Sequence, residues 1–164
     1  MQANSISIRR DPAVQYLLRL GDTCLILGQR LGEWCGHAPI LEEDIALTNM
    51  ALDLLGQARA LLTHAAALEG QGLDEDQLAF LRDERHYLNP VMMELPRGDF
   101  AFTILRQFLY AAFMHPYFEQ LTASKDETLA AIAAKSVKEM AYHLRHAGEW
   151  VIRLGDGTEF RLGT

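Results

Sequence analysis

The 164-residue sequence has no long uninterrupted apolar segment. Its most apolar stretch, from Phe100 to Phe118, contains Arg106 and Pro116. A membrane-spanning helix needs about 20 predominantly apolar residues, so we expect no membrane span. The N-terminal segment MQANSISIRRDPAV carries charge but no apolar core, and we therefore do not expect a secretory signal either.

Cysteine and basic residues are also scarce. Cys24 and Cys35 are the two cysteines, eleven positions apart on one predicted helix. At about 1.5 Å of rise per residue they lie roughly 16 Å apart, too far for a disulfide. We therefore expect a reduced, cytoplasmic protein. Fifteen Lys and Arg residues against 22 Asp and Glu residues give a net charge of -7, which argues against nucleic-acid binding.

Strand patterns are nearly absent, and apolar residues recur at the spacing of an α-helix. The chain is long enough for one hydrophobic core, and we expect a single domain over 1–164. The fold class predicted is all-α, an antiparallel four-helix bundle with a short extra helix between the second and third long helices. The predicted long helices cover about 12–34, 39–69, 100–122 and 124–154, with the short segment at 75–87.

Local signals refine these helices. Ser124 to Glu127 read as a capping box for the last helix, and Pro116 is expected to kink or shorten the third. Three glycines share one face of the first helix and indicate close approach by another backbone, or else a face that tolerates glycine: Gly21, Gly28 and Gly32.

Five blocks of the sequence resemble, in the same order, the C-subunit family of ring-1,2-phenylacetyl-CoA epoxidase. This enzyme is a multicomponent bacterial oxygenase of phenylacetate breakdown. The blocks are LGDTCLILGQRLGEWCGHAP, EEDIALTNMALDLLGQAR, LAFLRDERHYLN, GDFAFTILRQ and KEMAYHLRHAGEWVIRLGDGT. The resemblance implies a ferritin-like helical bundle. It also implies a partner, the catalytic A subunit that holds the di-iron site, with the other subunits and a reductase contacted indirectly.

The ligand pattern of the catalytic relative can be placed on this sequence through the resemblance. Asp53-Leu54-Leu55-Gly56-Gln57 stands where the relative carries Asp-Glu-x-Gly-His. The vestigial ligand positions implied in this way are Leu25, Leu54, Gln57, Ala111, Met140 and His143. Iron ions need several carboxylates, so we expect no catalytic, cofactor-binding or metal-binding residues in this chain and the di-iron centre in its partner.

Other polar and aromatic residues have simpler interpretations. His143 is interpreted as a core histidine. Asn49, Asp53 and Gln57 recur at every fourth position and fit a buried hydrogen-bond network, a contact between subunits or a solvated face. Glu139 and His143 fit a pair on one helix surface better than a metal pair. Three aromatic residues are interpreted as packing or interface anchors: Trp34, Tyr87 and Trp150.

Three functions remain open at this level. The leading one is a non-catalytic structural subunit of an epoxidase complex that adds one oxygen atom from O2 to the aromatic ring of phenylacetyl-CoA, with electrons from a separate reductase. The second is an autonomous metalloenzyme that uses Glu33, Asp53, Glu139 and His143. It is disfavoured because Glu33 lies near the end of its helix. The third is a general helical adaptor.

The resemblance carries one further expectation. Members of the family continue past the segment Arg153 to Thr158 into further helices, so the chain is expected to be C-terminally truncated. Apolar faces on the third and fourth long helices should then be exposed, and the isolated chain should self-associate.

Overall fold

The computed structural model describes residues 5–157, and within them every regular element is helical. The long helices are α1 (Pro12–Gly32), α2 (Leu41–Glu69), α5 (Phe100–Leu121) and α6 (Glu127–Gly155). Between α2 and α5 lie α3 (Glu75–Phe80), the 3-10 turn η1 (Glu84–His86) and α4 (Val91–Glu94). The predicted all-α, ferritin-like bundle with short helical structure between its second and third long helices is confirmed.

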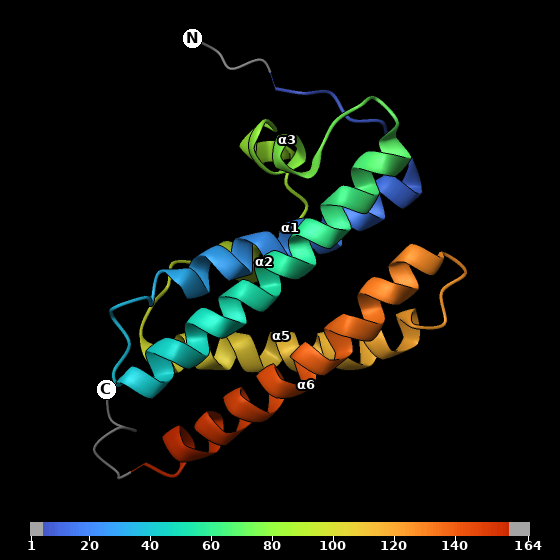
Figure 1. Ribbon diagram of the computed structural model, residues 1–164. Coiled ribbons are helices and arrows are strands. Elements are labelled where there is room, and N and C mark those ends of the chain that lie inside the picture. The colour runs from blue at the N-terminus through green and yellow to red at the C-terminus, as the bar shows by residue number, and fades with distance from the viewer. Residues whose placement is uncertain (1–4, 158–164) are drawn as a thin grey trace.

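The bundle is built from two helical hairpins, α1 with α2 and α5 with α6 (Figure 1). The hairpins meet chiefly where α2 packs against α6. The core is built mainly of leucine, alanine and methionine side chains, and all four long helices contribute to it. Within the described residues, no helix combines the length and the apolar character needed to cross a membrane.

Side-chain caps set the starts of the helices. The Asp11 carboxylate accepts hydrogen bonds from the first turn of α1, and Asp74 forms a capping box with Gln77 at the start of α3. The predicted capping box at Ser124 is wrong, because α6 begins later. Asp126 is its N-cap, and its Oδ1 accepts from the Leu129 amide at 3.0 Å, while Ser124 supports the preceding turn by accepting from the Asp126 amide at 3.1 Å.

Two further expectations about the helices also need correction. The segment predicted over 75–87 divides, because Arg82 turns inward after α3 and its side chain is buried in an ion pair. Pro116 does not shorten α5, which continues to Leu121. Proline removes one backbone donor, and in α5 the remaining helical and tertiary contacts accommodate this loss.

The glycines of α1 differ in their surroundings. A Cβ atom on Gly28 would lie 3.3 Å from the Ala51 carbonyl oxygen on α2, so this position is a close approach of two helix backbones. A Cβ on Gly21 would meet the Leu62 side chain at 2.9 Å. Gly32 has no atom within 4 Å of such a Cβ, and the expectation of close approach is wrong there.

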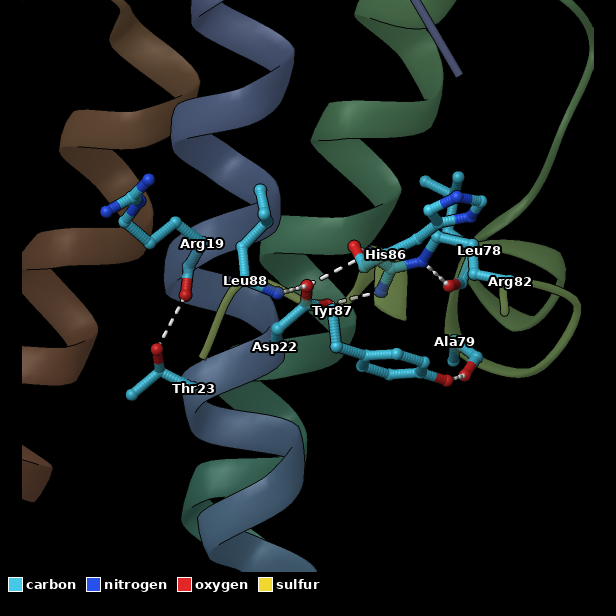
Figure 2. A network of polar contacts seen from close by, with 9 residues as sticks. All are labelled: Arg19, Asp22, Thr23, Leu78, Ala79, Arg82, His86, Tyr87 and Leu88. Carbon is cyan, nitrogen blue, oxygen red and sulfur yellow. Dashed lines mark hydrogen bonds and ion pairs between the residues drawn. The ribbon is translucent and has the colours of Figure 1, made fainter. Parts of the chain in front are cut away.

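A buried ion pair fixes the segment between α3 and α4 to α1 (Figure 2). Both side chains of the pair, Asp22 and Arg82, are fully buried. One Asp22 oxygen accepts from Arg82 Nη1 at 2.9 Å and from the Leu88 amide at 2.9 Å, and Arg82 Nη1 also donates to the His86 carbonyl oxygen at 3.3 Å. One carboxylate on α1 therefore ties both Arg82 and Leu88 of this segment to the bundle.

Apolar side chains also face solvent on the long helices. On α5 they recur at helical spacing, with Leu105, Leu109 and Phe113 all exposed. On α6 the exposed large apolar side chain is Ile152. The exposed apolar face expected on the third and fourth long helices is thus concentrated on α5 within the part of the chain that the structure describes. The expectation about residues after 157 falls outside that part.

Candidate functional site

Five of the six residues that the resemblance placed at ligand positions lie inside the bundle, and the sixth, Leu25, is buried beside α3. Leu54, Ala111, Met140 and His143 are fully buried, and Leu25 and Gln57 are almost completely buried. Leu54 and Gln57 come from α2, Ala111 from α5, and Met140 and His143 from α6. The centre therefore contains aliphatic and thioether side chains at positions where the catalytic relatives are expected to carry carboxylates.

One polar chain crosses this centre through His143. Its Nε2 lies 3.1 Å from Asp53 Oδ2, and its Nδ1 lies 2.9 Å from Gln107 Nε2. In this arrangement the ring donates from Nε2 to the carboxylate and accepts at Nδ1 from the Gln107 amide. Both ring nitrogens are thus engaged, and three helices, α2, α5 and α6, are joined by one imidazole.

A second polar chain passes through Gln57. Its Nε2 donates to Glu139 Oε2 at 2.7 Å, and its Oε1 accepts from Cys24 Sγ at 3.6 Å. The same thiol lies 3.3 Å from the Tyr110 hydroxyl, and Lys135 lies 3.4 Å from the other Glu139 oxygen. This chain connects all four long helices: α1, α2, α5 and α6.

The inner members of the second chain are neutral. Burial raises the pKa of the Cys24 thiol to about 12, and its hydrogen bond with Tyr110 offsets only part of that rise. Burial also raises the pKa of Tyr110 well above its ordinary value, helped by the neighbouring thiol. Both groups therefore keep their protons near pH 7, and neither is an activated nucleophile or base.

Several predicted residues lie away from this centre. Leu25 lines a shallow pocket beside α3, and the preceding residue, Cys24, is the one that contacts Gln57 and Tyr110. Asn49 is exposed, so only Asp53 and Gln57 of the predicted polar stripe join the hydrogen-bond network. The stripe is therefore divided between solvent and the bundle centre.

The residue set of the autonomous metalloenzyme does not come together. Glu33 follows the end of α1 and forms an ion pair with Arg30 at 2.5 Å. Asp53 contacts His143, whereas Glu139 is held by Gln57 and Lys135. In residues 5–157 no group of three or more His, Cys, Asp or Glu side chains is arranged to hold a metal ion.

A di-iron centre does not fit these donors. Two iron ions carry at least four positive charges, which in this class of bundle are balanced by several glutamates. Leu54 and Ala111 offer no donor atom, and Met140 offers only a soft thioether where hard oxygen ligands are needed. The remaining carboxylates, Asp53 and Glu139, already accept hydrogen bonds from His143 and Gln57.

The aromatic residues pack as interpreted. Trp34 donates from Nε1 to Thr103 Oγ1 at 3.0 Å and meets Phe100 edge-on at 5.9 Å, and Phe100 in turn meets Trp150 at 5.0 Å. The Arg97 guanidinium lies over the Trp34 ring at 4.3 Å. These contacts join the ends of α1, α5 and α6 and provide no cofactor site.

Sequence reasoning missed three members of the network: Cys24, Gln107 and Tyr110. Cys24 fits the apolar stripe of the first helix, and nothing in the sequence marks it as a hydrogen-bond partner. Gln107 lies one helical turn before Ala111 and therefore on the same face of α5, which is a signal that could have identified it. Tyr110 has no equivalent sequence signal, because an aromatic residue in an apolar helix is usually core.

Comparison with known proteins agrees with this picture of a ferritin-like bundle. Residues 1–161 match the family described as phenylacetic acid catabolic protein. A relative from Escherichia coli (strain K12), named as the C subunit of 1,2-phenylacetyl-CoA epoxidase, is 58% identical over 144 residues, which are 88% of this chain. The matched region covers 58% of the relative, so the chain spans about three fifths of that protein's length.

Proposed function

The chain belongs to the phenylacetic acid catabolic protein family, and we propose that it is a non-catalytic structural subunit of a cytoplasmic oxygenase complex. The complex would epoxidise the aromatic ring of phenylacetyl-CoA in phenylacetate catabolism. The name of its relative, the C subunit of 1,2-phenylacetyl-CoA epoxidase, supports this assignment. The di-iron chemistry would belong to the catalytic A subunit, and electrons would come from a separate reductase.

The observation that carries the proposal is the composition of the bundle centre. Leu54, Ala111 and Met140 fill it with aliphatic groups and a thioether instead of the carboxylate oxygens that a di-iron centre needs, and His143 uses both ring nitrogens within the protein. Four carboxylates without metal would repel one another and lose hydration, at several kcal/mol per unpaired ion. A centre filled in this way holds its helices in place without a metal ion, which suits a scaffold.

The test is co-expression of this chain with the catalytic subunit, followed by size-exclusion chromatography and measurement of iron in each fraction. We expect the two chains to elute together, and we expect iron to follow the catalytic subunit. This chain purified alone should contain far less than one iron per molecule. A catalytic subunit that elutes alone under the same conditions would overturn the scaffold assignment.

The same purification separates the scaffold from the autonomous metalloenzyme. His143→Ala removes the buried imidazole, the best remaining ligand for a metal ion. The scaffold proposal predicts the same low iron content in the variant and the unaltered chain. Near-stoichiometric iron in the unaltered chain that is lost in His143→Ala would favour the metalloenzyme instead.

A further inference from the structure

A cleft of about 310 Å³ lies between the segment before α1 and the turn η1. We call it the basic cleft, because its charged and titratable lining residues are Arg10, Arg85 and His86. Gln15 adds an amide, and Leu18 and Leu88 add apolar surface. No acidic side chain of the described residues lines it.

The positive charge of the basic cleft is not neutralised by its surroundings. Neither Arg10 nor Arg85 forms an ion pair with any residue in the described part of the chain, although the protein as a whole has a net charge of -7. Two aspartates close to these arginines along the chain, Asp11 and Asp83, bind backbone amides instead. Asp11 Oδ1 accepts from Ala13 at 2.8 Å, and Asp83 Oδ1 accepts from Arg85 at 3.0 Å.

The walls of the basic cleft are held in place by buried and backbone contacts. The segment that carries Arg85 and His86 is fixed by the buried Asp22–Arg82 pair, because Arg82 also donates to the His86 carbonyl oxygen (Figure 2). The opposite wall pairs with it where the Ile6 amide donates to the Leu81 carbonyl oxygen at 3.2 Å. Ser5 Oγ accepts from the Asp83 amide at 2.9 Å and also lies 3.3 Å from His86 Nδ1.

We propose that the basic cleft binds the phosphate group of a small organic phosphomonoester. Two guanidinium groups suit phosphate because each presents several N–H donors in a planar fork and remains charged. A volume near 300 Å³ is at the lower end for small-ligand sites, so it accommodates a phosphate with a compact apolar group. That group would contact Leu18 and Leu88, together with Ile6 and Ile8 from the opposite wall.

The test is calorimetric titration of the full chain at low ionic strength, where screening of exposed charges is weak. Three probes separate the parts of the proposal: inorganic phosphate, phenyl phosphate and phenol. We expect saturable binding of phenyl phosphate, weaker binding of inorganic phosphate and no binding of phenol. Binding of phenyl phosphate and inorganic phosphate with equal affinity would overturn the assignment of an ester.

Variants identify the residues responsible. Arg10→Gln and Arg85→Gln should each weaken phenyl phosphate binding roughly tenfold, since each removes one charge-assisted hydrogen-bond donor group. Arg19→Gln is the matched control, because Arg19 is exposed on α1, lies outside the cleft and changes the net charge equally. We expect less than about a twofold effect from it, on the rule that screened surface charges contribute little.

Two results would overturn the proposal. One is the absence of saturable phenyl phosphate binding by the unaltered chain at ligand concentrations up to about 10 mM. The other is an equal loss of affinity in Arg19→Gln and Arg85→Gln, which would indicate nonspecific attraction. All three arginines are exposed, and circular dichroism of each variant verifies that the helical fold is retained.

Discussion

Leu54→Glu tests the register on which the interpretation of the bundle centre depends. Leu54 lies on α2 with 0% of its surface exposed, and its Cβ lies next to Gly28 on α1, where that glycine has no side chain. A buried leucine side chain stabilises the fold by about 2 kcal/mol, and replacement by glutamate removes this contribution. It also places a carboxyl group in the core, where an unpaired polar group costs about 1–3 kcal/mol and an unpaired charge costs more.

The surroundings offer the new carboxylate little compensation. His143 is the basic group at the bundle centre, and both of its ring nitrogens already bind Asp53 and Gln107. An ion pair with the new glutamate would therefore break an existing hydrogen bond. Together these contributions predict a loss of at least about 3 kcal/mol in the free energy of unfolding near pH 7.

The measurement is urea unfolding followed by circular dichroism, with Leu52→Glu as the control. Leu52 lies on the same helix and is 61% exposed, so the same substitution should change the free energy of unfolding by less than about 0.5 kcal/mol there. A loss for Leu54→Glu no larger than that of the control would show that position 54 faces solvent. The assignment of the ligand positions on α2 would then be wrong.

The pH dependence gives a second check on the same variant. Burial disfavours the charged form of a carboxyl group and so raises its pKa in the folded state. The folded state then binds a proton more readily than the unfolded state, and the cost of the substitution should decrease as the pH falls from 7 to 5. The control at position 52 should show no such decrease relative to the unaltered chain.

Two further predictions concern the ends and the surface of the bundle. Asp126→Ala should cost about 1 kcal/mol at pH 7 by removing the cap of α6. The hydrogen bond from His64, and after it the one from the Leu129 amide, lowers the pKa of Asp126 below its ordinary value. The contribution of Asp126 to the free energy of unfolding should therefore be complete near neutral pH and decrease below about pH 4. Chemical unfolding measured across this pH range checks the prediction. The isolated chain should self-associate through the apolar face of α5. Because Phe113 is 66% exposed on this face, Phe113→Gln should shift the sedimentation of the chain toward that of the monomer. An unaltered chain that sediments as a monomer at all concentrations would refute this.

The helical architecture was accessible from the sequence because it depends on local patterns. Apolar periodicity located all four long helices, and proline, glycine and aspartate marked most of their ends. The error at Ser124 arose where two neighbouring residues could both cap, since Asp126 is the stronger acceptor and lies closer to the first turn. Such choices depend on backbone geometry that residue spacing does not specify.

The polar contacts of the interior were less accessible because they join residues far apart in the chain. Asp22 and Arg82 are 60 positions apart, and neither position shows a pattern that predicts its partner. Cys24 and Tyr110 are 86 positions apart and joined through a contact that only the packing of α1 against α5 creates. The resemblance pointed to positions that are buried, but it placed Leu25 where Cys24 makes the contacts, and it did not show which side chains bond across the centre.

The distribution of charge within the two central chains explains how the bundle tolerates buried polar groups without a metal ion. Asp53 and Glu139, the members that carry negative charge, lie at the ends of their chains, with 33% and 15% of their side chains exposed. The inner members, Gln57 and Cys24, are neutral and hydrogen-bonded. Partial hydration of the carboxylates reduces the cost of their charge, while Gln57 and Cys24 are hydrogen-bonded to their neighbours at the centre. Of the positions matched to di-iron ligands, Gln57 and His143 therefore take part in the hydrogen bonds that join the four long helices, whereas Leu54, Ala111 and Met140 are buried apolar groups.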